Sequence, residues 1–137
     1  MFAHILSVLG YVVCTFAVQG TSHFVVNKAH YAAMPHLRAE PIVAMGISSM
    51  VIQGAVLTFL YSRSDLAERG LIGALVMAWA VGLVIVSYIA LAEYGKYNLT
   101  GFASWATVEV TVGVIQFTLI GIALWLAHRF AGAAQAA

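Results

Sequence analysis

Four long runs of apolar residues constrain the fold of this chain more than any other feature of its sequence. They cover residues 5–26, 42–61, 70–92 and 102–127. A helix needs about 20 residues to cross a hydrocarbon core of about 30 Å, and each run is about that long. Because lipid offers no partner to backbone N–H and C=O groups, apolar runs of this length are expected to be helical. The sequence therefore predicts four membrane-spanning helices.

The composition agrees with this prediction. Of the 137 residues, 63% are hydrophobic and 8% are charged, whereas about a quarter of the residues in soluble domains are charged. So few charged side chains could not cover the core of a soluble protein. We expect a single transmembrane domain over residues 1–137 that is all-α. Short connections place successive helices side by side, which predicts an antiparallel four-helix bundle in the membrane.

The charge of the chain limits its partners and leaves its orientation open. A net charge of +1 gives no electrostatic footprint for nucleic acid, so the expected partner is the lipid bilayer. A bacterial inner (plasma) membrane is the expected location. We call side A the side of both termini and side B the side where the first run ends. Three basic residues fall on each side, so the positive-inside rule does not orient the chain; they are Arg63, Arg69 and Arg129 on side A, and Lys28, Arg38 and Lys96 on side B.

Small residues recur at intervals of four along the third run, at Gly70, Ala74, Ala78 and Gly82. Such a ridge lets another helix approach closely. We favour packing within the chain, and a homodimer is the alternative.

Polar residues gather where the runs meet on side B. Gln19, His23, Asn27 and Tyr31 recur every four residues, a spacing that keeps them close to one helical face. The other members of the predicted polar pocket are Gln53, Glu109 and Gln116. Counted from Phe102, Glu109 lies about 10 Å inside the fourth run at 1.5 Å per residue. Contacts of Glu109 with His23 or with Gln19 are therefore geometrically allowed.

Two interpretations compete for this polar pocket. In one, Glu109 and His23 form a protonatable pair whose pKa values are shifted by desolvation and by each other. In the other, the same groups are interhelical hydrogen bonds worth about 1 kcal/mol or less each. We favour the second interpretation for Gln19, Gln53 and Gln116. We favour a function for Glu109, because a structural hydrogen bond does not require a carboxylate.

The chain carries no recognisable cofactor or metal motif. His23, His30 and His36 lie towards side B, but no HxxxH pair occurs, and a bis-histidine haem would require two intramembrane histidines on facing helices. We therefore expect no metal and no cofactor. Phosphate-binding loops, nucleophile elbows and CxxC motifs are also missing from the sequence.

A set of short motifs carries a resemblance to known proteins. It consists of Ser22-His23-Phe24, Tyr31, Gln53-Gly54, Tyr61, Lys96-Tyr97, Glu109 and Gln116. With these motifs the chain resembles small uncharacterised bacterial four-helix inner-membrane proteins that are grouped as a domain of unknown function. The resemblance covers nearly the whole chain. It implies a four-helix inner-membrane fold and no particular activity.

Three functions are open at this point. The favoured one is non-enzymatic: a small accessory or scaffold component that packs into a larger membrane assembly through the small-residue ridge. The alternative is a small transporter or proton-coupled element that uses the pocket around Glu109 and His23. The third is a membrane enzyme acting on a lipid or a quinone, with His23 and Glu109 as general acid and base. The sequence specifies no substrate, partner or oligomeric state.

Overall fold

The computed structural model describes residues 1–34, 38, 40–99 and 101–136, and their regular structure is helical. The elements in chain order are α1 (Phe2–Thr21), η1 (Ser22–Val26), α2 (Lys28–Ala32), α3 (Val43–Ser62), η2 (Asp65–Arg69), α4 (Gly70–Ser87), η3 (Tyr88–Glu93), α5 (Tyr94–Lys96) and α6 (Phe102–Ala136). The π-helical turns η1 and η3 continue α1 and α4, and η2 is a short 3₁₀ helix.

Four helical segments are long and apolar enough to cross a membrane, by length and composition. They run over Phe2–Val26, Val43–Ser62, Asp65–Lys96 and Phe102–Gly132, which confirms the prediction of four long apolar helices. The first begins three residues before the predicted run 5–26, and the third continues past residue 92 to Lys96. Hydropathy marks the apolar part of a helix, whereas backbone hydrogen bonding carries the helix into the polar residues at its ends.

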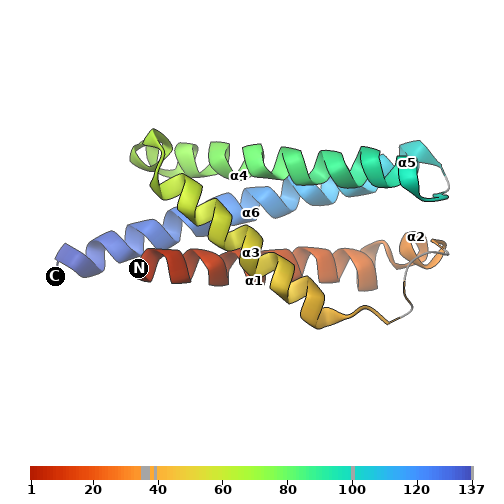
Figure 1. The fold of residues 1–137 in the computed structure, drawn as a ribbon, viewed down its shortest axis with the longest axis horizontal. Coiled ribbons are helices and arrows are strands. Elements are labelled where there is room, and N and C mark those ends of the chain that lie inside the picture. The colour runs from red at the N-terminus through yellow and green to blue at the C-terminus, as the bar shows by residue number, and fades with distance from the viewer. Residues whose placement is uncertain (35–37, 39, 100, 137) are drawn as a thin grey trace.

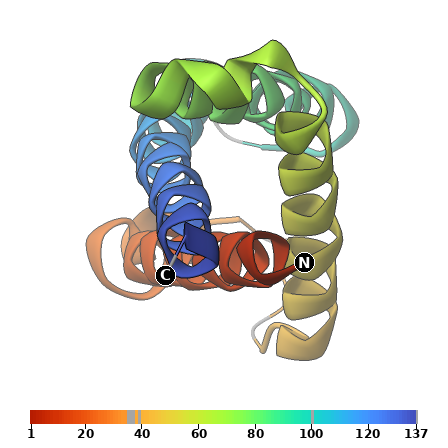
Figure 2. The same ribbon diagram turned by 90° about the vertical axis from the view of Figure 1, so that its left-hand side faces the viewer.

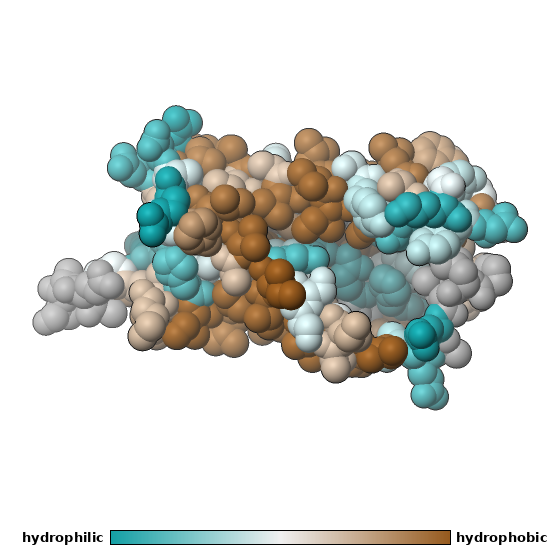
Figure 3. All heavy atoms as spheres, in the orientation of Figure 1, coloured by the Kyte–Doolittle hydropathy of each residue, from teal (hydrophilic) through white to brown (hydrophobic). Residues whose placement is uncertain are grey.

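Apolar side chains cover much of the outer surface along the helices. Figure 3 shows hydrophobic residues over the length of the molecule and hydrophilic residues gathered towards its two ends. Each long helix exposes large aliphatic side chains, among them Val13, Ile52, Leu83 and Val114. In soluble proteins such side chains are mostly buried. Here apolar surface surrounds the helices.

The helix α6 is the central element of the arrangement. It packs along α1 on one side and along α4 on the other, and α1 also packs against α3. In Figure 1 both chain ends lie at the left, which is side A, and α2 and α5 lie at the right, which is side B. The views in Figures 1 and 2 agree that α3 runs obliquely to α1, α4 and α6.

The oblique course of α3 leaves one face of the molecule open. At side A, α3 ends close to η2 and the start of α4, and at side B it begins well away from α4 (Figure 1). Figure 3 shows that the same face is hollowed between these elements, with hydrophilic surface at the bottom of the hollow. We call this depression the front hollow.

Small residues set the close approach of α4 and α6. Ala74 and Ala78 are fully buried, and Gly82 is buried as well. A Cβ atom at Gly82 would overlap Cγ of Phe117, and one at Gly121 would lie 3.3 Å from Cβ of Ala78. The predicted ridge therefore faces α6 of the same chain.

Gly70 does not share this close packing. A Cβ atom there would have its nearest neighbour at 3.9 Å, on Trp125. Its φ of +58° lies in a region that L side chains rarely adopt, so Gly70 serves the turn between η2 and α4 instead.

Candidate functional site

Glu109 of α6 and Tyr31 of α2 form the centre of the polar cluster. The Tyr31 hydroxyl donates a hydrogen bond of 2.8 Å to Oε1 of Glu109. Glu109 is 6% exposed, and Tyr31 is buried too. A polar group in such surroundings is costly unless it is hydrogen-bonded. Burial also raises the pKa of Tyr31 above its ordinary value, so its hydroxyl keeps the proton that it donates.

His23 of η1 lies directly against Tyr31. The two rings stack with their centroids 3.6 Å apart and their planes 9° from parallel. Nδ1 of His23 is 3.0 Å from the backbone oxygen of Gln19. Because a carbonyl oxygen only accepts, Nδ1 carries a proton, and neutral His23 presents Nε2 as an acceptor. His23 thus approaches Glu109 through the tyrosine ring, and no described hydrogen bond joins His23 to Glu109.

A second layer of the cluster lies deeper between α1 and α6. Nε2 of Gln19 donates to Oε1 of Gln116 at 2.6 Å, and Nε2 of Gln116 donates to Oγ1 of Thr15 at 3.2 Å. These bonds hold the centres of two long helices together. The side chain of Gln19 therefore pairs with Gln116, about two turns further along α6 than Glu109.

The backbone after α1 positions His23 and Tyr31, which form the first layer of the cluster together with Glu109. The π-helical turn η1 ends in a hydrogen bond of 2.8 Å from the backbone N–H of Asn27 to the carbonyl of Ser22, and Asn27 then leaves helical geometry with φ −106° and ψ 20°. The Asn27 side chain donates back to Oγ of Ser22 at 2.9 Å. Because α2 starts anew at Lys28, the ring of Tyr31 lies on His23, and the predicted stripe is not one straight helix.

An apolar cluster closes the side B end of the site. It is formed by Tyr31, Met34, Leu99 and Trp105. The indole N–H of Trp105 donates to the carbonyl oxygen of Ile89 at 3.2 Å, and the ring of His30 stacks on the indole at 6.0 Å. These contacts tie α2, η3 and α6 together above Glu109.

Gln53 stands apart from the other predicted pocket residues. Its Oε1 accepts a hydrogen bond of 2.7 Å from Tyr11, and its Nε2 donates to Ser49 at 3.0 Å. Both bonds belong to the crossing of α1 and α3. No described hydrogen bond links Gln53 to Glu109.

Sequence reasoning missed four residues of these networks: Tyr11, Thr15, Ser22 and Trp105. The first two precede Gln19 by eight and four residues, so extending the same spacing backwards would have found them. Trp105 precedes Glu109 by one helical turn. Ser22 appears in the sequence only within the resemblance motif, and its hydrogen bond with Asn27 depends on the π-helical turn.

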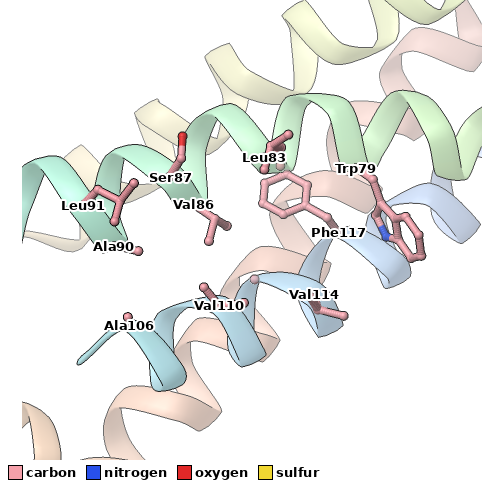
Figure 4. A pocket seen from close by; sticks show the side chains of 12 residues that line it. Trp79, Leu83, Val86, Ser87, Ala90, Leu91, Ala106, Val110, Val114 and Phe117 are labelled. Atoms are coloured by element: carbon pink, nitrogen blue, oxygen red, sulfur yellow. The ribbon is translucent and has the colours of Figure 1, made fainter. Parts of the chain in front are cut away.

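An apolar groove lies between α4 and α6 on the side B half of the molecule (Figure 4). Its volume is about 510 Å³. Small residues on both helices, among them Gly82, Ala90, Ala106 and Gly113, widen it, and larger side chains such as Leu83 and Val114 edge it.

Within the described residues, no three His, Cys, Asp or Glu side chains come together to hold a metal ion. His36, one of the three histidines towards side B, lies outside the described residues.

Comparison of the chain with protein-family models, with curated proteins and with solved structures found no match. The resemblance to uncharacterised four-helix proteins therefore stays an expectation. Functional conclusions rest on the site itself.

Proposed function

We propose that this chain is an integral membrane protein with a protonatable binding site at Glu109, and that it acts as a small transporter or as the proton-coupled element of one. In this proposal the four apolar helices cross the bilayer in antiparallel order, in a bacterial inner membrane. Support comes from the apolar outer surface of all four helices and from both chain ends lying at side A (Figure 1).

One observation carries the proposal: only one oxygen of the Glu109 carboxyl is occupied by a described residue. Oε1 receives the hydroxyl of Tyr31. Oε2 receives no hydrogen bond from the described residues. It is not a buried atom without a partner either, because His30 Nε2 is the only such side-chain atom among those residues. A carboxyl group that served only to join helices would be expected to use both oxygens. The free oxygen favours a ligand or a proton.

The neighbouring residues have distinct roles in this proposal. Tyr31 fixes the carboxyl by holding Oε1, and the stacked His23 ring holds Tyr31 in turn. The apolar cluster with Trp105 excludes water from side B. A proton on Glu109 and a ligand at Glu109 would exclude each other, which is how a single carboxyl couples the two.

Labelling with a hydrophobic carbodiimide tests the proposal. Dicyclohexylcarbodiimide partitions into lipid and modifies protonated carboxyl groups that it can reach. In native membranes we expect one adduct on the peptide that contains Glu109, and none on it in E109Q. The variant E68Q, at the exposed η2 turn on side A, is the matched control and should label at Glu109 like the wild type. If Glu109 is modified only after denaturation, the site is sealed and the proposal fails.

Membrane insertion and location need their own experiment. After extraction of bacterial membranes with alkaline carbonate, the protein should stay in the pellet. It should also co-fractionate with inner-membrane vesicles on a density gradient. Release into the supernatant would exclude a membrane-spanning protein.

A scaffold or accessory role in a membrane assembly is the second candidate. The groove between α4 and α6 favours it, because small residues in its floor would admit an apolar partner helix (Figure 4). The predicted ridge itself is not available to a partner, since Ala74 and Ala78 are already covered.

A photo-crosslinking residue at Leu83, beside the groove, tests this second candidate. Ile52 of α3 is the control position, because it is similarly exposed but does not line the groove. A crosslink from position 83 alone to a second copy, or to one defined membrane protein, supports docking in the groove. Crosslinks to lipid only, or equal crosslinks from both positions, count against it.

A further inference from the structure

A second groove lies between the end of α1, η1 and α6, and it is separate from the groove between α4 and α6. Its volume is about 380 Å³, whereas one water molecule requires only about 15 Å³. We call it the threonine groove; its polar lining residues are Thr21, Ser22, Asn27, Thr107 and Thr111. Asn27 directly follows the first apolar span, which ends at Val26. The groove therefore begins at the side B boundary of that span.

The polar lining of this groove favours water over a lipid chain. Thr21, Thr107 and Thr111 lie within apolar spans and have exposed side chains. Acyl chains offer no hydrogen-bond partner to a hydroxyl group, and such a group is costly without one. Water in the groove would supply those partners, and the groove has room for several molecules.

A chain of hydrogen bonds joins the threonine groove to Glu109. Oγ of Ser22 accepts a hydrogen bond of 2.9 Å from the side chain of Asn27, and the Ser22 side chain is also hydrogen-bonded to Tyr31. The hydroxyl of Tyr31 gives its single proton to Oε1 of Glu109. The Tyr31 oxygen must therefore accept from Ser22. Both hydroxyl groups are thus directed towards the carboxyl group.

We infer that this chain is the proton path of the site, and that a proton passes from water in the threonine groove through Ser22 and Tyr31 to Glu109. In one passage a hydronium ion gives a proton to Oγ of Ser22, Ser22 gives its own to the oxygen of Tyr31, and Tyr31 gives its own to Oε1 of Glu109. Hydronium becomes water, the carboxylate becomes a carboxylic acid, and each hydroxyl keeps one proton. Both hydroxyls then rotate back. This inference rests on the proposed function and specifies how its proton arrives.

Other routes to Glu109 fit the contacts less well. From side B the site is covered by the apolar cluster that contains Trp105. Two further titratable groups are near: His23 stacks on the face of the Tyr31 ring, and Glu93 of η3 acts on Glu109 through its charge. Neither of them lines the threonine groove. Among the described residues, Ser22 is the one that both lines this groove and contacts Tyr31.

Time-resolved infrared spectroscopy after a light-triggered pH drop tests the inference, with the full-length protein in phosphatidylcholine nanodiscs. The carbonyl band of protonated Glu109 is the one that E109Q lacks. S22V and S22T are a matched pair, because their side chains are similar in shape and differ in the hydroxyl. We expect S22T to gain the band at the wild-type rate and S22V at least about tenfold more slowly, since proton transfer through a positioned group contributes about 10²–10⁴-fold. The final amplitude should be the same in both, which a purely structural role of Ser22 does not predict.

A second pair of variants tests the groove without changing a buried position. T111F places a ring in the threonine groove, and V114F places one in the groove between α4 and α6. Both positions are exposed. T111F should slow the protonation of Glu109 by a similar factor, because the ring displaces water, and V114F should leave the rate unchanged. A wild-type rate in S22V or in T111F, or equal slowing within either pair, would overturn the inference.

Carbodiimide labelling judges the proposed function separately. If Glu109 is labelled in native membranes and S22V keeps the wild-type rate, the protonatable site stands and only the proton path falls. If Glu109 is labelled only after denaturation, the proposed function and the proton path fall together.

Discussion

The hydroxyl of Tyr31 donates a 2.8 Å hydrogen bond to Oε1 of Glu109, a residue 78 positions further along the chain. This bond joins the short helix α2, which follows the first long helix, to the last long helix α6. It also brings an acidic group beside a stacked pair of rings from Tyr31 and His23.

Removal of the Tyr31 hydroxyl should destabilise the fold. In Y31F the ring still stacks on His23, but Oε1 of Glu109 loses its donor, so we expect the free energy of unfolding to fall by about 1–3 kcal/mol. E109Q keeps an amide oxygen that can accept a hydrogen bond from Tyr31, so the free energy of unfolding should fall less in E109Q than in Y31F. Reversible unfolding in mixed micelles measures both. Y94F is the control, because the Tyr94 hydroxyl forms no hydrogen bond with a described residue, and an equal loss in Y94F would contradict the assignment.

Gln19 and Gln116 should be energetically coupled. Their side chains share a hydrogen bond of 2.6 Å, and interhelical hydrogen bonds in membrane proteins are worth about 0.6 kcal/mol on average and about 1.7 at most. A double-mutant cycle of Q19M and Q116M should give a coupling energy in this range. The cycle of Q53M and Q116M should be additive, since Gln53 bonds to Tyr11 and Ser49 instead. Coupling in the second cycle would mean that the two polar networks are connected.

The contact between α4 and α6 should not tolerate a methyl group at Gly82. A Cβ atom there would overlap Cγ of Phe117 and lie 3.0 Å from its Cβ, so the root of that side chain would have to move. We expect G82A to lower the free energy of unfolding by about 1–3 kcal/mol. G46A on α3 is the control, because a Cβ atom at Gly46 meets nothing within 4 Å. There the higher helix propensity of alanine should be neutral or stabilising by up to about 1 kcal/mol.

Tyr31 should ionise only at a pH above its ordinary pKa, and this ionisation should lower the free energy of unfolding at high pH. Burial raises its pKa above the ordinary value of 10.0, so the folded protein holds a proton that the unfolded chain releases near pH 10. The stabilisation is therefore complete below pH 10 and is lost as the pH rises towards the folded pKa. Difference absorbance of phenolate between wild type and Y31F, together with their unfolding free energies, measures this. A phenolate signal from Tyr31 near pH 10 in the folded protein would contradict the prediction.

Several features of the fold were readable from the residues alone. Runs such as 102–127 are too long and too apolar for any other structure, and their helices formed as predicted. The cost of burying a carboxyl group also marked Glu109 as an unusual residue before any contact was known. The small residues Ala74, Ala78 and Gly82 likewise suggested a close helix contact, although not which helix would fill it.

The sequence did not reveal which polar side chains would contact each other. Spacing of four residues grouped Gln19, His23, Asn27 and Tyr31, but it could not foresee that η1 is π-helical and that the chain turns at Asn27. That turn is what brings Tyr31 back to His23. In the same way, the oblique course of α3 takes Gln53 to Tyr11.

The sequence by itself determined that the chain forms four long apolar helices and that its polar groups are rare and mostly near side B. Burial of apolar surface is non-directional, so composition and length are enough to specify it. Only the tertiary structure decided that Tyr31 holds Glu109 and that Gln116 pairs with Gln19. Hydrogen bonds depend on distance and angle, and these follow from the rotation and crossing of packed helices.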